Sequence, residues 1–267
     1  MPPLAAISFD WGTFTGYLLP PDSPTWHALA ATVYIAVIAQ VVGVVLGLFS
    51  ALAQMSKRRL VRLVAGVYIW FFRGTPVIVQ IFFTYFGANL FLGFDLFPRS
   101  VSVLGIGLDG AVIAGTVALA VNEGAYMSEI VRAGIAAVDP GQMEAAKSVG
   151  MTRGLAMRRI VLPQAARVIV PPLGNEFNNM LKTTSLLAFI GVRELFQDAD
   201  IRYSSTFKAT EFFLGVAILY LMLTTIWTVV QSQIERKLGA SDRDEDEPGW
   251  LGRLLGRGAA PAAGRAR

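Results

Sequence analysis

Two uncharged apolar segments of membrane length constrain the fold of this chain more than any other feature. Leu29–Ala53 and Phe212–Ile234 contain no Asp, Glu, Lys or Arg, and one helical bilayer crossing needs about 20 mostly apolar residues. Three further segments have a comparable length but contain polar or charged residues: Leu63–Gly87, Gly110–Val131 and Ala165–Ile190. Only 16% of all residues are charged, against about 25% in soluble domains. We therefore predict an all-α, polytopic membrane protein with about five transmembrane helices.

The distribution of Lys and Arg predicts how these segments are oriented. No Lys or Arg precedes Lys57, whereas four basic residues lie within residues 57–62 and six within residues 132–167. Cytoplasmic loops carry an excess of basic residues, so we expect both loops inside, together with Arg236 and Lys237 after the last segment. The protein is therefore expected in a bacterial cytoplasmic membrane, with its N-terminus outside and its C-terminus in the cytoplasm.

The composition divides the chain into three regions. Residues 1–24 contain several Trp, Phe and Tyr residues, which favour the membrane–water interface, and we expect an extracytoplasmic interfacial segment there. Residues 25–238 form the expected transmembrane domain. Residues 239–267 are first acidic and then rich in Ala, Gly and Arg, a composition typical of a disordered tail. A short interfacial helix at residues 250–257 is the alternative for part of this tail.

Rare residue types exclude several classes of function. The chain has no Cys and a single His, His27, which excludes disulfides, thiolate metal sites and a His-rich metal site. It contains no G-x-x-x-x-G-K-[ST] phosphate-binding loop, so we expect neither ATP hydrolysis by this chain alone nor a bound cofactor. No nucleophile accompanies its acid–base residues, which disfavours a membrane enzyme. The net charge of +4 arises in loops between apolar segments and does not indicate nucleic-acid binding.

The second basic loop is predicted to contain a short, capped helix. Asp139 can cap its start, Gln142 can complete a capping box, and Gly150 is suited to end it. Thr152 can then cap a second helix, which we expect to run to Pro163. On capping alone, an ordinary amphipathic connector is the better explanation of these features.

A set of residues in this loop has a fixed spacing: Glu144, Ala145, Ala146, Gly150, Ile160, Leu162 and Pro163. This spacing resembles the signature EAA loop of importer-type ABC permeases. Segments 72–76, 122–126 and 172–186 are similar to the polar-amino-acid branch of that family, and the resemblance covers roughly residues 25–237.

The resemblance implies a set of partners. The loop helix would be a coupling helix that docks into a groove on a separate ATPase subunit, which would bind the ATP and Mg. The ATPase-coupling residues would be Glu144, Ala145, Ala146, Gly150 and Pro163. The family also implies a second permease copy or a paralogue, an extracytoplasmic solute-binding protein and an amino-acid substrate.

Polar residues in the apolar segments are candidates for a substrate path, because intramembrane charge is costly unless it is paired or faces water. They are Arg73, Thr75, Glu123, Tyr126, Glu176, Asn179, Lys182, Thr183 and Ser185. Glu176 and Lys182 could bind a zwitterion, or they could form only a structural pair. Arg73 could line the path or snorkel to the inner surface. Glu123 departs from the small residue common in the family and could affect substrate choice.

We therefore interpret the chain as the permease subunit of an ATP-driven importer for polar amino acids. The alternative is an ion-coupled secondary transporter of a small zwitterionic solute, since intramembrane Glu and Lys also suit a proton-coupled carrier. Near the cytoplasmic end of Gly110–Val131, Glu129 and Arg132 are expected to form an i,i+3 ion pair.

Overall fold

The described part of the chain is almost entirely helical. The computed structural model describes residues 9–19, 21–87, 90–91, 93, 96–98, 100–103 and 106–239. The elements in chain order are α1 (Trp11–Leu18), α2 (Ser23–Gln54), α3 (Arg59–Gly74), α4 (Val77–Phe82), the π-helical turn η1 (Phe83–Gly87), β1 (Ser100–Val103), β2 (Ile106–Asp109), α6 (Gly110–Ala136), α7 (Pro140–Ser148), α8 (Arg153–Ala156), the π-helical turn η2 (Met157–Val161), α9 (Leu162–Thr183), the 3-10 helix η3 (Thr184–Ile190), α10 (Leu195–Thr206) and α11 (Ala209–Lys237). The tail predicted to be disordered lies outside the described residues from position 240 onward.

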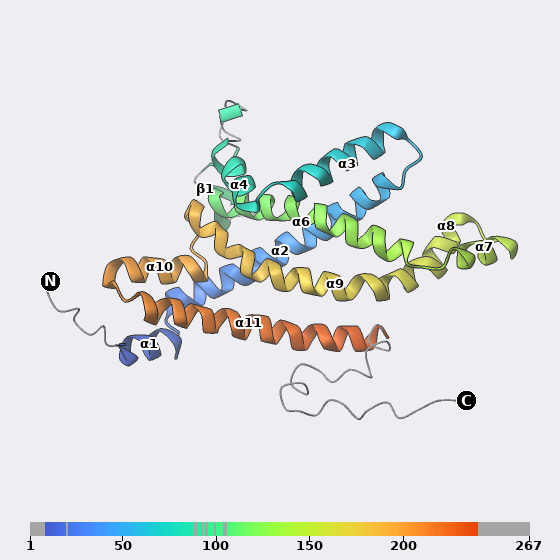
Figure 1. Ribbon diagram of the computed structural model, residues 1–267. Helices are drawn as coiled ribbons and strands as arrows, with labels where there is room; N and C mark the ends of the chain where they lie inside the picture. Colours follow the sequence, from blue (N-terminus) through green and yellow to red (C-terminus); the bar gives the residue numbers. More distant parts are fainter. Residues whose placement is uncertain are drawn as a thin grey trace, which may run out of the picture.

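The long helices run along one axis of the molecule (Figure 1). Helices α2, α6, α9 and α11 form an elongated bundle, with α1 and α10 at one end and α7 and α8 at the other. We call these the α1–α10 end and the α7–α8 end. The only strands in the described residues, β1 and β2, pair as an antiparallel hairpin with Ser100 opposite Asp109. This hairpin lies within the loop that precedes α6 and leaves the helical fold class unchanged.

Small residues bring α2 and α6 into close contact. A Cβ atom added to Gly43 would lie 2.6 Å from Cγ of Glu123, and one added to Gly47 would lie 2.3 Å from Cβ of Met127. The α2 residue Ala39 is fully buried in the same core. Close approach through small residues is the usual basis of helix packing in membranes, where apolar burial between helices is a weak driving force.

The helices support fewer crossings than the sequence predicts. Within the described ranges, three helices are long and apolar enough to span a bilayer, namely α2, α6 and α11, and the bent pair of α3 with α4–η1 makes up to four. The expected fourth segment, Ala165–Ile190, differs from a spanning helix. Its helix α9 carries Arg167, Glu176 and Lys182 and gives way to a 3-10 helix after Thr183. The predicted all-α, polytopic fold is therefore confirmed, with three to four helices apolar enough to span a bilayer in the described residues. The second and fourth expected segments are each divided between successive helices.

The N-terminal segment packs onto the α1–α10 end. Helix α1 begins at the Asp10 cap, whose carboxylate also pairs with Lys208. The ring of Tyr17 meets that of Phe212 edge-to-face at 5.3 Å between centroids. Trp11, by contrast, is 69% exposed, as an interfacial residue would be.

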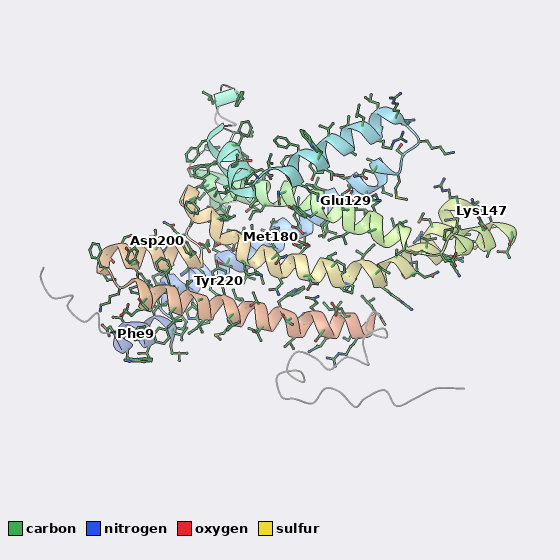
Figure 2. All side chains as sticks on the ribbon, viewed as in Figure 1. Phe9, Glu129, Lys147, Met180, Asp200 and Tyr220 are labelled. Atoms are coloured by element: carbon green, nitrogen blue, oxygen red, sulfur yellow. The ribbon has the colours of Figure 1, made fainter. Side chains whose placement is uncertain are left out.

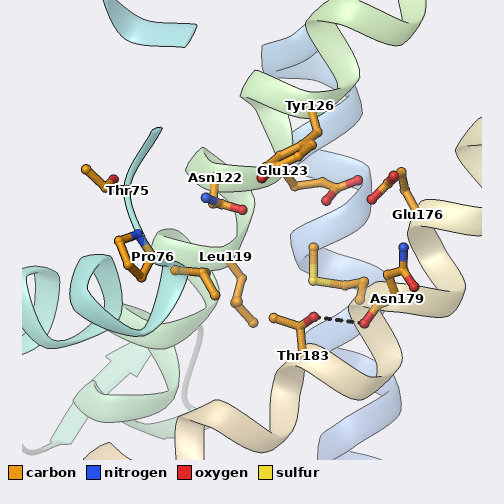
Figure 3. Close-up of a pocket in the computed structure, with 11 residues that line it drawn as sticks. Thr75, Pro76, Leu119, Asn122, Glu123, Tyr126, Glu176, Asn179 and Thr183 are labelled. Carbon is orange, nitrogen blue, oxygen red and sulfur yellow. Dashed lines mark hydrogen bonds between the residues drawn. The ribbon is translucent and has the colours of Figure 1, made fainter. Parts of the chain in front are cut away.

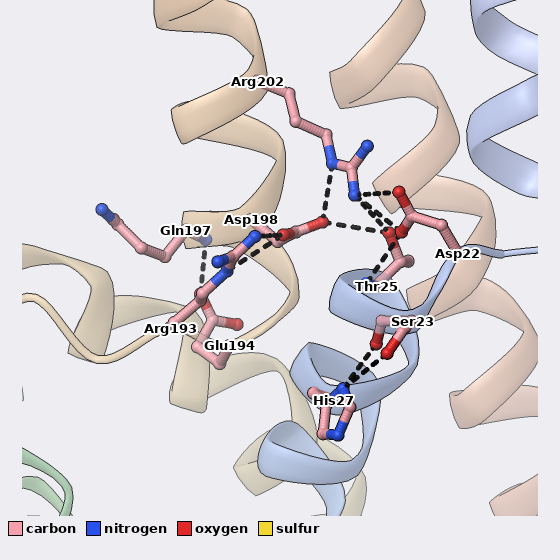
Figure 4. Close-up of polar contacts among 9 residues, drawn as sticks. All are labelled: Asp22, Ser23, Thr25, His27, Arg193, Glu194, Gln197, Asp198 and Arg202. Atoms are coloured by element: carbon pink, nitrogen blue, oxygen red, sulfur yellow. Dashed lines mark hydrogen bonds and ion pairs between the residues drawn. The ribbon is translucent and has the colours of Figure 1, made fainter.

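An ion-pair network joins α2 to α10 at the same end (Figure 4). Arg202 donates to both carboxylate oxygens of Asp22 at 2.7 Å, and to Asp198 at 3.1 Å. Arg193 donates to the other oxygen of Asp198, a fully buried residue, at 2.6 Å. Burial alone would raise the pKa of Asp22, but hydrogen bonds from Arg202 and Thr25 outweigh it and lower the pKa to about 2. The network therefore favours ionised Asp22.

Candidate functional site

A cavity of about 370 Å³ lies where α9 and α6 face the break between α3 and α4 (Figure 3). Six of the predicted path residues line it: Thr75, Glu123, Tyr126, Glu176, Asn179 and Thr183. The lining is completed by Pro76, Val77, Leu119, Asn122 and Met180. Residues more than a hundred positions apart in the chain thus meet in one polar cavity, at the small end of the volume range of ligand sites.

Three predicted path residues do not line this cavity. Ser185 donates its hydroxyl proton to the carbonyl of Lys182 at 2.7 Å, and the Lys182 side chain is exposed. No ion pair joins Lys182 to Glu176 in the part of the chain that the structure describes. Neither the opposite-charge pocket nor the structural pair expected of these two residues is therefore formed. Arg73 lies beside the cavity, with its guanidinium 5.4 Å from the centroid of the Tyr126 ring.

The cavity exists because the predicted second span is broken. The axes of α3 and α4–η1 meet at 109°, in agreement with the helix-breaking residues Gly74 and Pro76 in this segment. Pro76 has no N–H to donate to the carbonyl of Phe72, so the helical ladder fails there. The side-chain amides of Gln80 and Asn122 donate to that carbonyl instead, at 2.9 and 3.0 Å.

Gln80 and Asn122 hold the break in a fixed shape. Gln80 also donates to the carbonyl and hydroxyl oxygens of Thr75, at 3.1 and 2.8 Å, and accepts from Asn122 at 2.9 Å. Backbone groups that lose their helical hydrogen bonds inside a membrane need such partners. Broken helices of this kind occur where the backbone lines a cavity. Neither amide was among the predicted path residues. The positions of Gln80 shortly after a Gly-Thr-Pro sequence, and of Asn122 directly before Glu123 in a mostly apolar span, are the signals that could have identified them.

Glu123 is held deep in the wall of the cavity. It is 4% exposed and accepts a hydrogen bond from the side chain of Gln40 at 3.0 Å. Gly43 leaves room for its Cβ–Cγ stem. Gln40 was missed by the sequence reasoning, although it is the only amide in the otherwise uncharged Leu29–Ala53 segment, and an isolated amide in such a helix commonly bonds to another helix.

A second cluster lies on α6, between the cavity and the α7–α8 end. Glu129 accepts from Arg132 at 2.7 Å, which confirms the expected i,i+3 pair. Glu129 also accepts from Gln54 of α2 at 3.2 Å and lies 4.0 Å from the guanidinium of Arg73. The carboxylate of Glu129 therefore engages the charge of Arg73.

Helix α7 protrudes beyond the bundle as a short, well-terminated rod, and Lys147 on it lies at the extreme end of the molecule (Figures 1 and 2). The Asp139 carboxylate accepts from the amide of Gly141 at 2.7 Å, as a cap does. The predicted capping box is not formed, because the Gln142 side chain accepts from Gln164 of α9 at 3.5 Å. That contact links α7 to the start of the long helix.

The end of α7 depends on Gly150. Its φ of 84° lies in the left-handed region, which glycine adopts without a steric penalty. The amide of Gly150 donates to the carbonyl of Lys147 at 2.9 Å, and that of Met151 to Ala146 at 3.0 Å. These two bonds make a Schellman motif, a tight helix stop that satisfies the last carbonyls.

The predicted ATPase-coupling residues differ in exposure. Glu144, Ala145 and Gly150 are exposed, whereas Ala146 is 3% exposed and faces the interior of the molecule. Two small alanines were expected to permit close approach of a partner, but only Ala145 presents its side chain to the outside. Ala146 instead allows α7 to pack closely on its own subunit.

The predicted end of the second loop helix at Pro163 is wrong. Thr152 caps α8 as expected, accepting from the amide of Leu155 at 3.4 Å, but the chain continues through η2 into α9. Pro163 occupies the first turn of α9, where its missing N–H is tolerated. The π-helical turn Met157–Val161 just before it changes the hydrogen-bond ladder, so the helix passes the proline without ending.

A multi-helix membrane protein with a polar cavity at a broken helix and a rigid helix projecting from one end has the build of a transport subunit. Residues 43–240 match the family described as "Binding-protein-dependent transport system inner membrane component". The chain belongs to this family, which confirms the resemblance seen in the loop. It is a multi-pass inner-membrane component and not the catalytic subunit of such a system.

Several known proteins are similar over most of the chain. ArgU of Corynebacterium glutamicum, an arginine transport system permease protein, is 39% identical over 86% of this chain and 72% of its own length. TcyB of Bacillus subtilis, an L-cystine transport system permease protein, is 36% identical over 80% of this chain and 87% of its own.

Solved structures share the fold. A crystal structure of an amino acid ABC transporter with histidines has a TM-score of 0.75 and 38% identity, covering 86% of this chain and all of that one. An inward-facing structure of the MetNI methionine ABC transporter has a TM-score of 0.64, with 84% of this chain and 97% of that chain covered. At 18% identity, this second likeness concerns the fold alone.

Proposed function

We propose that this chain is the permease subunit of an ABC importer for polar amino acids and that the cavity at the Thr75–Pro76 break is part of its translocation path. The observation that carries the proposal is the meeting of six path residues, predicted from three separate segments, in one cavity. Amino acids need hydrogen-bonding groups at fixed positions, and this lining supplies carboxylates, two amides and hydroxyls.

The named substrates of the relatives support the substrate class. ArgU is a permease protein for arginine and TcyB for L-cystine. Both are amino acids with polar side chains, but their charges differ. The relatives therefore favour polar amino acids as a class and do not single out one member.

Helix α7 is the proposed contact with a separate ATPase subunit. Its exposed residues Glu144 and Ala145 face away from the chain, and Glu144 offers a carboxylate to a basic partner. The Schellman stop at Gly150 and the contact between Gln142 and Gln164 make the helix stiff and couple it to α9. Since α9 carries Glu176 and Asn179, movement of α7 would reach the cavity wall directly.

The arrangement of the basic residues supports N-terminus outside and C-terminus in the cytoplasm. The α2–α3 loop with residues 57–62, the loop with residues 132–159 and the end of α11 all lie toward the α7–α8 end. The α1–α10 end is then extracytoplasmic and faces the solute-binding protein. A second permease, either a copy or a paralogue, would complete the membrane pathway, and ATP and Mg would be bound only by the ATPase.

ATP-driven uptake in proteoliposomes tests this function. Vesicles that contain the chain, its ATPase and its binding protein should accumulate a radiolabelled polar amino acid only when ATP is present. The ion-coupled alternative predicts a different result, because such a carrier would take up substrate in vesicles that contain this chain only. Uptake by the chain alone, driven by a proton or sodium gradient, would contradict the proposal.

A further inference from the structure

The charges that line the cavity have one sign. Its only Asp, Glu, Lys, Arg or His residues are Glu123 and Glu176, according to the described part of the chain. Sequence reasoning expected Lys182 to balance Glu176, but Lys182 is exposed and does not line the cavity. The cavity is thus an acidic compartment without a lining cation.

A basic residue beside the cavity already has a partner. Arg73 lies 4.0 Å from Glu129 and covers the Tyr126 ring at 5.4 Å. Because an opposite charge and a ring face hold its guanidinium beside the cavity, it is not free to neutralise the carboxylates inside. A cation from outside the chain would therefore find two carboxylates without a basic partner.

Glu123 differs from a surface carboxylate because its side chain is buried and held by α2. Its stem lies against Gly43, where a Cβ atom would approach within 2.6 Å. One carboxylate oxygen accepts from Gln40 at 3.0 Å, and no hydrogen bond to the other oxygen is found within the described ranges. Burial of a carboxylate with a single neutral donor is costly, and a positively charged ligand would reduce that cost.

The second carboxylate lies opposite the first. In Figure 3, the carboxyl groups of Glu123 on α6 and Glu176 on α9 point toward one another. Like charges that face each other repel, and a cation placed between them is attracted by both. The two helices also approach the cavity from different sides, so both groups can contact one bound molecule.

From this arrangement we propose that the cavity selects amino acids with a positively charged side chain, and that Glu123 and Glu176 determine this specificity. The inference rests on the proposed function, because it assumes that substrate enters the cavity. A zwitterionic amino acid brings one positive group, which its own carboxylate offsets. A cationic amino acid brings two positive groups, one for each carboxylate, and an anionic amino acid would add repulsion.

The selectivity can be measured without the solute-binding protein, whose own preference would mask it. The complex of this chain with its ATPase, in lipid nanodiscs, is titrated with radiolabelled L-arginine and then with competing L-citrulline or L-glutamate. Citrulline has nearly the shape of arginine but a neutral ureido group. We expect arginine to bind about tenfold or more tightly than citrulline, and glutamate to compete least.

Two isosteric variants and one control locate the effect. Glu123→Gln and Glu176→Gln keep the side-chain shape, and the one whose carboxylate binds the guanidinium should reduce the preference for arginine over citrulline by about tenfold. The other variant, whose carboxylate binds the α-ammonium, should weaken arginine and citrulline alike. Glu235→Gln is the control, because Glu235 lies on α11, bonds to Gln231 and does not line the cavity. It should leave both affinities unchanged.

The outcomes separate this inference from the proposed function. If arginine and citrulline bind the wild-type complex equally well, the inference is overturned while the transport function stands. The same holds if Glu123→Gln and Glu176→Gln both retain the wild-type ratio. If none of the three amino acids binds, both the inference and the proposed path are overturned. The wild-type comparison needs no substitution, so a variant that fails to fold does not remove the test.

Discussion

At the scale of single residues, side-chain amides maintain the opening in this membrane bundle. Pro76 removes one backbone hydrogen bond, and Gln80 and Asn122 replace it with bonds to the carbonyl of Phe72. Each amide comes from a different helix, so the break is tied to both α4 and α6. The cavity shape thus depends on Gln80, which does not line the cavity, as well as on Asn122, which does.

We predict that Asn122→Ala destabilises the break. It removes the donors to Phe72 and to Gln80 and should lower the free energy of unfolding by roughly 1 kcal/mol. Thermal unfolding in detergent measures this effect. Asn175→Ala is the matched control, because Asn175 is exposed on α9. A wild-type midpoint for Asn122→Ala would contradict the assigned role.

A second residue-scale prediction concerns Asp22 and acid. The pKa of Asp22 is lowered from 3.8 to about 2, so the folded state favours its ionised form. A lowered carboxyl pKa contributes stability that is present above the unfolded pKa and is lost as the pH falls through the folded pKa. Asp22→Asn should therefore lower the unfolding midpoint at pH 7, with the difference narrowing between about pH 4 and pH 2.

The control for Asp22 is Asp200→Asn. Asp200 lies on α10 close to the network but has no ion pair in the described part of the structure. The unfolding midpoint of Asp200→Asn should equal that of the wild type across the same pH range. If the difference in unfolding midpoint between wild type and Asp22→Asn stayed constant down to pH 2, the ion pair with Arg202 would not be its cause.

At the scale of elements, α7 and α9 form one lever. Helix α7 is capped at both ends and touches α9 through Gln142 and Gln164. After the turn at Gly150, α8 and the turn η2 lead into α9 without a break. Helix α9 then carries Glu176 into the cavity. The element that would contact the ATPase and the element that lines the path are thus linked by a few residues, which suits the transfer of a rigid-body movement.

Glu144→Lys should uncouple the two proteins. Glu144 is exposed, and its side chain makes no hydrogen bond or ion pair within the described part of the chain. Insertion and folding should therefore be preserved, while a reversed charge should repel a basic groove. We expect ATP-driven uptake to fall to background and ATPase co-purification to decrease. Gln233→Lys, an exposed substitution on α11, should have no effect. Normal uptake by Glu144→Lys would refute the docking surface.

At the scale of the whole molecule, the polarity of the bundle determines the function of each end. The basic loops and α7 share one end, and the aromatic N-terminal helix and the ion-pair network share the other. An importer needs these two ends to meet different partners on opposite sides of the bilayer. The orientation in the bilayer therefore determines which partner can bind at each end.

The absence of Cys makes this orientation directly testable. Val149→Cys at the tip of α7 and Phe207→Cys after α10 are 77% and 82% exposed positions. A membrane-impermeant maleimide should label Phe207→Cys in spheroplasts, and should label Val149→Cys only in inside-out vesicles. Labelling of Val149→Cys in intact spheroplasts would reverse the proposed topology.

Much of the fold was readable from local chemistry. Uncharged segments such as Leu29–Ala53 form helices in any apolar setting, because their backbone groups must bond internally. The cap at Asp139, the stop at Gly150 and the pair of Glu129 with Arg132 are short-range effects, which act within a few residues, so the chain order alone predicts them.

The remainder depended on contacts between distant residues. At the 109° bend, Asn122 of α6 donates a hydrogen bond to the Phe72 carbonyl that Pro76 leaves without a partner. No local pattern in α3 predicts that Asn122 is the donor. The burial of Ala146 and the continuation of the helix past Pro163 likewise depend on how α7 and α9 pack. Local sequence predicts which segments form helices, whereas packing sets the direction each side chain faces, and hence the charge inside the cavity.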